Sequence, residues 1–148
     1  MKKIMVLLFL VLSLCLIGCD LNFLSGTVYF YELAGDGNEP SDASLRYRKD
    51  GYTIIMSRGS GGESGWDTKE GAEGYKEKTT FTLKLDGKDI SPIEGSKSVA
   101  KLGKNRYHVV ESFELKSLPK GTHTLEGKTT FTDHSGGTRT NVVTLTIN

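Results

Sequence analysis

The sequence predicts an all-β domain, and three features of the chain lead to this prediction. Apolar and polar residues alternate with period two in several short runs, as expected of strands that bury one face. Turn-forming pairs such as Asp86-Gly87 separate these runs. No segment after residue 18 shows the period of an amphipathic helix. The chain is therefore expected to pack two sheets around one core.

The first 18 residues form a separate unit. Lys2 and Lys3 precede an apolar run, Ile4 to Ile17, that only Ser13 interrupts. This order of a basic and an apolar segment is typical of a secretion signal. At 14 residues the run is shorter than the roughly 20 that cross a bilayer as a helix, so a retained transmembrane segment is the weaker interpretation.

The motif Leu16-Ile17-Gly18-Cys19 at the end of this run resembles the lipobox of bacterial lipoproteins. The resemblance implies that a diacylglyceryl group is attached to the thiol of Cys19 and that the signal, residues 1–18, is removed. It also implies a lipid-anchored protein on the extracytoplasmic side of a bacterial membrane, in the cell envelope. The alternative is an ordinary secretion signal in which Cys19 is incidental.

Residues 19–25 would then be the lipidated cysteine and a short tether. The six residues after Cys19 span no more than roughly 20 Å when extended. We therefore expect the folded domain, residues 26–148, to lie close to the lipid surface.

The remaining 130 residues suit one domain. They carry 17 Lys and Arg against 18 Asp and Glu, a net charge of −1, which argues against nucleic-acid binding. Cys15 is removed with the signal and Cys19 carries lipid. No disulfide is therefore expected, and the hydrophobic core has to stabilise the fold.

The first half of the domain alternates between short strands and loops. We predict a first strand over Gly26 to Leu33, with apolar residues on both faces, and then a loop. Two strands, Ser44 to Arg48 and Tyr52 to Ser57, are expected to form a hairpin around Lys49-Asp50-Gly51. Residues 58–74 contain six glycines and predict a long mobile loop.

The second half is more regular. A strand from Thr79 to Leu85 leads through Asp86-Gly87 to a short strand at Asp89-Ile90, and Ser98 to Leu102 is predicted as an edge strand. Three longer alternating runs follow. The residues predicted to face the core are Tyr107, Val109, Phe113 and Leu115 in the first run, His123, Leu125, Gly127, Thr129 and Phe131 in the second, and Val143, Leu145 and Ile147 in the third.

The end of the chain resembles bacterial immunoglobulin-like domains. The pattern of these domains is Gly-x-His-Thr-Leu, then Asp-x-x-Gly, then a final strand. It is matched here by Leu118 to Leu125, by Thr132 to Gly137 and by the closing run Val142 to Ile147, with Gly137 where Asn is frequent. The resemblance implies an immunoglobulin-like antiparallel β-sandwich of about seven to nine strands. It also implies that His123 occupies a corner, where an imidazole N–H can bond a backbone carbonyl. It does not imply a function, because such domains serve as spacers, adhesins and binding modules.

No catalytic or metal-binding arrangement is apparent. His108, predicted to be exposed, His123 and His134 lack metal-ligand spacing, so neither a metal nor another cofactor is expected. Asp133-His134-Ser135 contains the residue types of a hydrolase triad, but adjacent turn residues do not form that relay. We therefore predict that the protein is not an enzyme.

Aromatic residues favour a binding function. They are concentrated in the first half of the domain: Tyr29, Tyr31, Tyr47, Tyr52, Trp66 and Tyr75. Trp66 within the glycine-rich loop is the strongest candidate, because an exposed tryptophan can clamp a sugar ring or an apolar patch. The alternative is that Trp66 packs onto the sandwich. The sequence thus predicts a non-catalytic module for an envelope protein or glycan, or else a spacer or assembly subunit.

Overall fold

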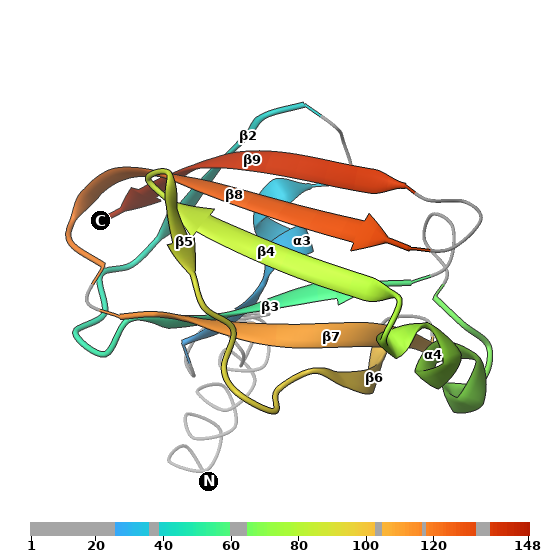
Figure 1. Ribbon diagram of the computed structural model, residues 1–148. Coiled ribbons are helices and arrows are strands. Elements are labelled where there is room, and N and C mark those ends of the chain that lie inside the picture. The colour runs from blue at the N-terminus through green and yellow to red at the C-terminus, as the bar shows by residue number, and fades with distance from the viewer. Residues whose placement is uncertain (1–25, 36–38, 60–64, 103–104, 117, 133–136) are drawn as a thin grey trace, which may run out of the picture.

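The computed structural model describes residues 26–35, 39–59, 65–102, 105–116, 118–132 and 137–148, so residues 1–25 with Cys19 lie outside the described part. Two β-sheets face each other across the core (Figure 1). The first sheet has the order β1-β3-β7-β6, with bounds Thr27–Tyr29, Tyr52–Arg58, Arg106–Leu115 and Ser98–Leu102. The second has the order β2-β9-β8-β4-β5, with bounds Ser41–Leu45, Thr138–Ile147, Gly121–Phe131, Thr79–Leu85 and Lys88–Ile90.

The strand order is that of an immunoglobulin-like sandwich. Strands β1, β3, β7 and β6 occupy the positions of A, B, E and D, while β4, β8 and β9 occupy those of C, F and G. The predicted all-β sandwich is therefore confirmed, but the predicted antiparallel pairing is incomplete, because β1 and β2 pair in parallel with β3 and β9. The hairpin of β4 and β5 and the edge strand Ser98–Leu102 also lie where the sequence predicted them.

The predicted hairpin between residues 44 and 57 is wrong. Strand β2 pairs in parallel with β9, whereas β3 pairs with β7, so residues 46–51 cross from one sheet to the other. Strand β1 also pairs in parallel, with β3. Gly51 has φ +74° and a Cβ there would overlap the Leu115 carbonyl oxygen, so the turn itself does require glycine. The Asp-Gly pair thus marks a turn without specifying which strands pair.

The predicted first strand is interrupted by a helical turn. Strand β1 ends at Tyr29, and α3 follows over Phe30–Ala34. The Glu32 carboxylate accepts a hydrogen bond from the Tyr29 backbone N–H at 3.2 Å, which favours the start of a helix. Phe30 enters the core, where a Cβ on Gly127 would lie 2.5 Å from its ring. The apolar residues on both faces of this run belong to a segment that closes the edge of the sandwich.

The prediction of a long loop over residues 58–74 is wrong in its second half, where the chain forms a helix. The expectation of no helix in the domain is also wrong. Helix α4 spans Lys69–Lys76, and the Thr68 hydroxyl caps it by accepting a hydrogen bond from the Gly71 backbone N–H at 3.1 Å. It contains two glycines, which lower helix propensity. Burial of Ala72 against the sandwich compensates for that loss.

The core lies between the two sheets and contains most of the alternating positions predicted to face inward. Fully buried side chains come from both halves of the chain: Ile54, Leu45, Leu83, Val109, Phe113, Leu115, Leu118, Leu125, Val143 and Leu145. None of the described helices is long and apolar enough to span a membrane.

Candidate functional site

The structure divides the six predicted aromatic binding residues among three places. Tyr52 belongs to the core: it is only 3% exposed, and its hydroxyl donates a hydrogen bond to the Arg46 carbonyl. Burial raises the pKa of Tyr52. This side chain is therefore not part of a binding surface, and its role is to hold the crossing between β2 and β3.

Tyr29 and Tyr31 form a stacked pair where β1 leads into α3. Their ring centroids are 5.4 Å apart, and Tyr31 is 47% exposed. The pair therefore offers an accessible aromatic surface on the edge of the sandwich.

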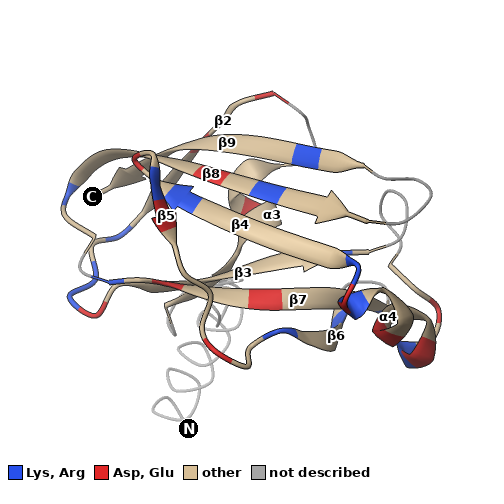
Figure 2. Cartoon of the chain, in the orientation of Figure 1, with Lys and Arg blue, Asp and Glu red and all other residues tan. Residues whose placement is uncertain are grey.

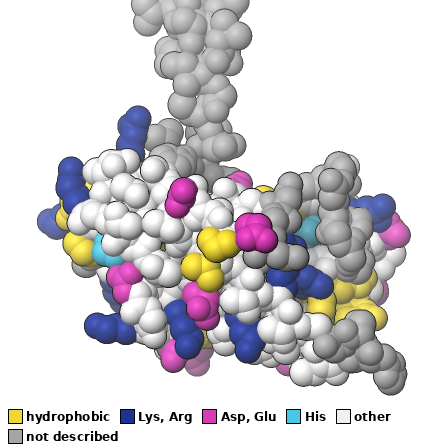
Figure 3. Space-filling model, turned by 90° about the horizontal axis from the view of Figure 1, so that it is seen from above, with side chains coloured by type: hydrophobic (Ala, Val, Ile, Leu, Met, Phe, Trp, Pro, Cys, Tyr) yellow, Lys and Arg dark blue, Asp and Glu magenta, His cyan; other side chains and the backbone are white. Residues whose placement is uncertain are grey.

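Tyr47 lies at one end of the sandwich and is 48% exposed. Its backbone N–H donates to the Asn148 carbonyl at 2.7 Å, and the ammonium group of Lys120 lies 6.0 Å from the centre of its ring. Basic residues occur at this end, on the left of Figure 2, and dark blue side chains lie along the left edge of the view in Figure 3. We call this region, formed by residues 46–50, 116 and 118–120, the basic end.

Helix α4 lies at the opposite end of the sandwich (Figure 1). It contains Tyr75, and Trp66 precedes it by three residues. Trp66 pairs with Tyr107 through two backbone hydrogen bonds of 2.8 and 2.9 Å, and its ring stacks on Tyr75 at 5.1 Å. Tyr75 meets Phe131 edge-on, and the Arg58 guanidinium lies 4.5 Å from the Phe131 ring centre. Trp66 is thus half-buried against the core, as the alternative interpretation predicted.

Two glycines close the base of the segment that leads to Trp66. A Cβ on Gly59 would lie 2.5 Å from the Gly65 Cα, and one on Gly65 would lie 2.7 Å from His108 Nε2. The chain therefore returns to the sheet at Gly65, which has φ +55°. The glycine-rich composition allows this close approach, and residues 60–64 lie outside the described part.

His108 packs against these glycines, so the prediction that it is exposed is wrong. The side chain is half-buried, and its Nδ1 is buried without a hydrogen-bond partner among the described residues. Burial lowers the pKa of His108 because the charged imidazolium loses its hydration. At neutral pH the ring is therefore uncharged.

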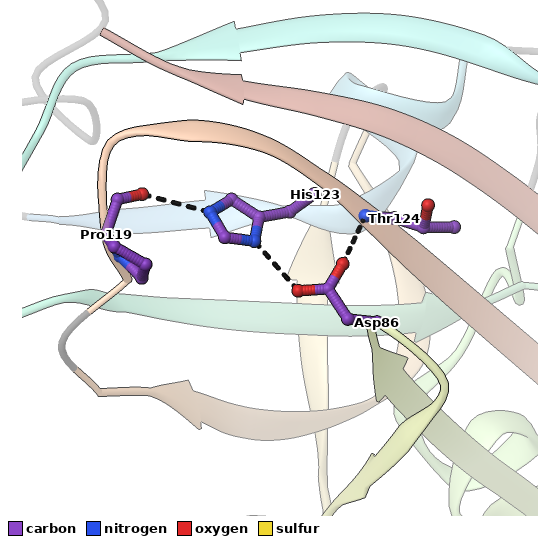
Figure 4. Close-up of polar contacts among 4 residues, drawn as sticks. All are labelled: Asp86, Pro119, His123 and Thr124. Atoms are coloured by element: carbon purple, nitrogen blue, oxygen red, sulfur yellow. Dashed lines mark hydrogen bonds and ion pairs between the residues drawn. The ribbon is translucent and has the colours of Figure 1, made fainter.

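His123 occupies the corner that the sequence predicted, and the predicted bond to a backbone carbonyl is present (Figure 4). Nε2 lies 3.0 Å from the Pro119 carbonyl, and Nδ1 lies 2.8 Å from Asp86 Oδ2. Because both partner oxygens only accept, both ring nitrogens carry hydrogen when both bonds form. The hydrogen bond to Asp86 and that to Pro119 raise the pKa of His123.

Asp86 is the residue of this corner that sequence reasoning did not assign. It has φ +50° in the turn between β4 and β5, and its Oδ1 accepts a hydrogen bond from the Thr124 backbone N–H at 2.8 Å. The bonds from His123 and Thr124 lower the pKa of Asp86. Asp86-Gly87 was recognised only as a turn signal, which concealed the second role of the carboxylate.

The pairing of Asp86 with His123 resembles the orienting half of a catalytic relay, but its geometry differs. In a relay, the far nitrogen of the imidazole must face a nucleophile or substrate. Here that nitrogen bonds the Pro119 carbonyl. The arrangement therefore joins the turn after β4 to the start of β8, and it offers no base for a reaction.

Within the described ranges, no three His, Cys, Asp or Glu side chains converge as a metal-binding group would. His134 and the Asp133-His134-Ser135 run fall outside those ranges.

The comparisons with known proteins return no match. Neither a family model, nor a curated protein, nor a solved structure matches this chain.

Proposed function

We propose that this protein is a lipid-anchored module of the bacterial cell envelope that binds an envelope protein or a glycan without catalysing a reaction. The anchoring half of the proposal depends on Leu16-Ile17-Gly18-Cys19, which supplies both the cleavage position and the thiol for the lipid. Mass spectrometry of the mature N-terminal peptide tests it, because a lipidated Cys19 adds the mass of its acyl chains. An unmodified or uncleaved N-terminus would contradict it.

The observation that supports binding is the set of accessible aromatic side chains. Trp66 and Tyr75 form a half-buried stack at one end, and Tyr29 and Tyr31 form a second stack on the edge. Stacked, partly exposed rings offer a rigid apolar surface that loses little conformational entropy when a sugar ring or a protein patch packs on it. Of the two stacks, the one with Trp66 has the larger ring and is held by the core.

Affinity capture from the native envelope tests this function. The wild-type protein is compared with Trp66→Ala and with Leu45→Ala as a control, since Leu45 is buried on β2 and lies outside the Trp66 stack. Both substitutions remove core contacts. A binding role predicts that only Trp66→Ala loses the captured ligand when the two variants are compared at temperatures where each is folded.

A second candidate function is a spacer or assembly subunit. The observation that favours it is the packing of Trp66 onto the core, which gives this residue a structural role. A spacer predicts that Trp66→Ala and Leu45→Ala behave alike in the capture experiment. It also predicts that Tyr31→Ser, which alters an exposed side chain, has no effect on capture.

A further inference from the structure

The basic end differs in charge from the rest of the mature chain. Its two segments contain one acidic residue, Asp50, and five basic residues: Arg46, Arg48, Lys49, Lys116 and Lys120. They therefore carry a net charge of +4. Because residues 19–148 carry −1 in total, the rest of the mature chain carries −5.

The two segments form one surface in the folded protein. A Cβ on Gly51 would overlap the Leu115 carbonyl oxygen and lie close to Lys116, and Lys120 lies over the Tyr47 ring. Arg46, Lys49, Lys116 and Lys120 are all exposed. Lys116 pairs with Glu114 at 3.3 Å, and both side chains of that pair face solvent. The surface thus keeps most of its positive charge toward solvent.

The described domain also begins at this surface. A Cβ on Gly26 would lie 2.8 Å from Arg48 Nε, and the Gly26 carbonyl accepts a hydrogen bond from the Thr53 backbone N–H at 2.8 Å. Only residues 20–25 separate Gly26 from Cys19. A lipid on Cys19 would therefore hold the surface around Arg48 within roughly 20 Å of the bilayer.

We propose that the basic end faces the bilayer and binds the headgroups of acidic phospholipids. The proposal rests on the lipid anchor proposed above, which supplies the short tether. Basic residues near an acidic lipid surface are attracted to it, and an exposed tyrosine among them suits the headgroup region, where its ring and hydroxyl meet different surroundings. The opposite end with the Trp66 stack then points away from the lipid, where another envelope molecule can reach it.

The orientation is tested on the lipidated protein in vesicles. A fluorophore is attached at Tyr47→Cys or, as the control site, at Glu73→Cys on exposed α4. The vesicles contain phosphatidylcholine alone or with phosphatidylglycerol, and both include lipid with a quencher in the headgroup. We expect quenching of the label at position 47 in the acidic vesicles, its relief by salt, and little quenching at position 73.

Two charge variants decide whether the basic residues cause this orientation. Arg46, Lys49, Lys116 and Lys120 are replaced together by Gln, and the matched control replaces four exposed lysines elsewhere: Lys69, Lys78, Lys101 and Lys128. The first variant should lose the quenching at position 47, whereas the second should keep it. Equal quenching in neutral and acidic vesicles, or equal loss in both variants, would overturn the proposal.

A separate arm removes both the signal and the lipid by using the mature chain, residues 19–148, with Cys19→Ser, and measures sedimentation with the same vesicles. At low salt, the fourfold variant of the basic end should bind acidic vesicles at least about tenfold more weakly, given up to about fivefold per neutralised residue. If Cys19 proves unlipidated but this difference persists, the anchor proposal fails and the lipid-binding surface stands. If lipidation is found but no difference appears, the lipid-binding surface fails alone.

Discussion

The two ends of the sandwich each contain a histidine, and the two rings have opposite surroundings. His123 at the basic end has a hydrogen-bond acceptor at each ring nitrogen, in Asp86 and Pro119. His108 at the Trp66 end is packed against Gly59 and Gly65 and leaves Nδ1 without a partner among the described residues. The pKa of the first is therefore raised and that of the second is lowered.

The contrast shows that the neighbours of a histidine, and not its type alone, set the direction in which its pKa shifts. Hydrogen bonds to acceptors stabilise an imidazolium, whereas desolvation destabilises it. One end of the molecule is thus held by a charged corner, and the other by close packing of glycines on a neutral ring. Each end should therefore respond to a different kind of perturbation.

The largest expected effect comes from crowding the Trp66 end. Gly65→Ala places a Cβ 2.7 Å from both His108 Nε2 and the Tyr107 carbonyl oxygen, at φ +55°. Left-handed backbone and overpacking together should lower the free energy of unfolding by about 3 kcal/mol. Denaturant unfolding measures this loss.

Gly74→Ala in α4 is the matched control, because a Cβ there meets no atom within 4 Å. It should raise stability by about 0.5 kcal/mol, as alanine favours a helix over glycine. If Gly65→Ala did not lower the free energy of unfolding relative to this control, close packing around Gly65 would not stabilise the Trp66 end.

A smaller effect is expected from breaking the charged corner. Asp86→Asn keeps the positive φ that asparagine tolerates, but it removes the charge that His123 bonds. Because the Asp86 side chain is 49% exposed, solvent screens the interaction, and we expect a loss of about 1 kcal/mol. NMR titration should show the pKa of His123 falling in this variant. An unchanged pKa would show that Pro119 alone sets it.

The two histidines should change the free energy of unfolding in opposite directions as pH rises. The pKa of His123 is raised above 6.5, so its contribution is complete below that pH and is lost as pH rises through the folded pKa. The pKa of His108 is lowered below 6.5, so its neutral form stabilises the fold above that pH, and this contribution is lost as pH falls.

Unfolding measured across this range in two variants separates the contributions. Asp86→Asn should flatten the slope on the alkaline side of pH 6.5, and His108→Gln should flatten the slope on the acidic side. Imidazole NMR signals give the two pKa values directly. A common pKa for both rings would remove the contrast between the two ends.

The smallest effect should come from a surface ion pair at the Trp66 end. Lys76 Nζ lies 3.4 Å from Glu73 Oε2 on α4, and both side chains are partly exposed. Lys76→Gln should therefore lower the free energy of unfolding by only about 0.3 kcal/mol. Thermal unfolding at low and high salt checks this. A loss comparable to that in Asp86→Asn would mean that charge matters equally at both ends.

The fold class and the regular strands of the second half follow from the sequence pattern. Strands β7, β8 and β9 bury alternate residues, and each long period-two run has one stable arrangement, with its apolar face in the core. The corner role of His123 was also predictable, since Pro119 lies four residues away and its carbonyl is within local reach.

The pairing of β2, the two helices and the distribution of the aromatic residues depend on long-range packing, which local sequence patterns do not report. Helices α3 and α4 are short, and burial of Phe30 and Ala72 stabilises them more than local propensity does. Asp86 meets His123 across 37 positions of the chain, and Trp66 finds Tyr107 across 41. Period and turn signals report only on near neighbours, whereas these contacts depend on which strands lie side by side after folding.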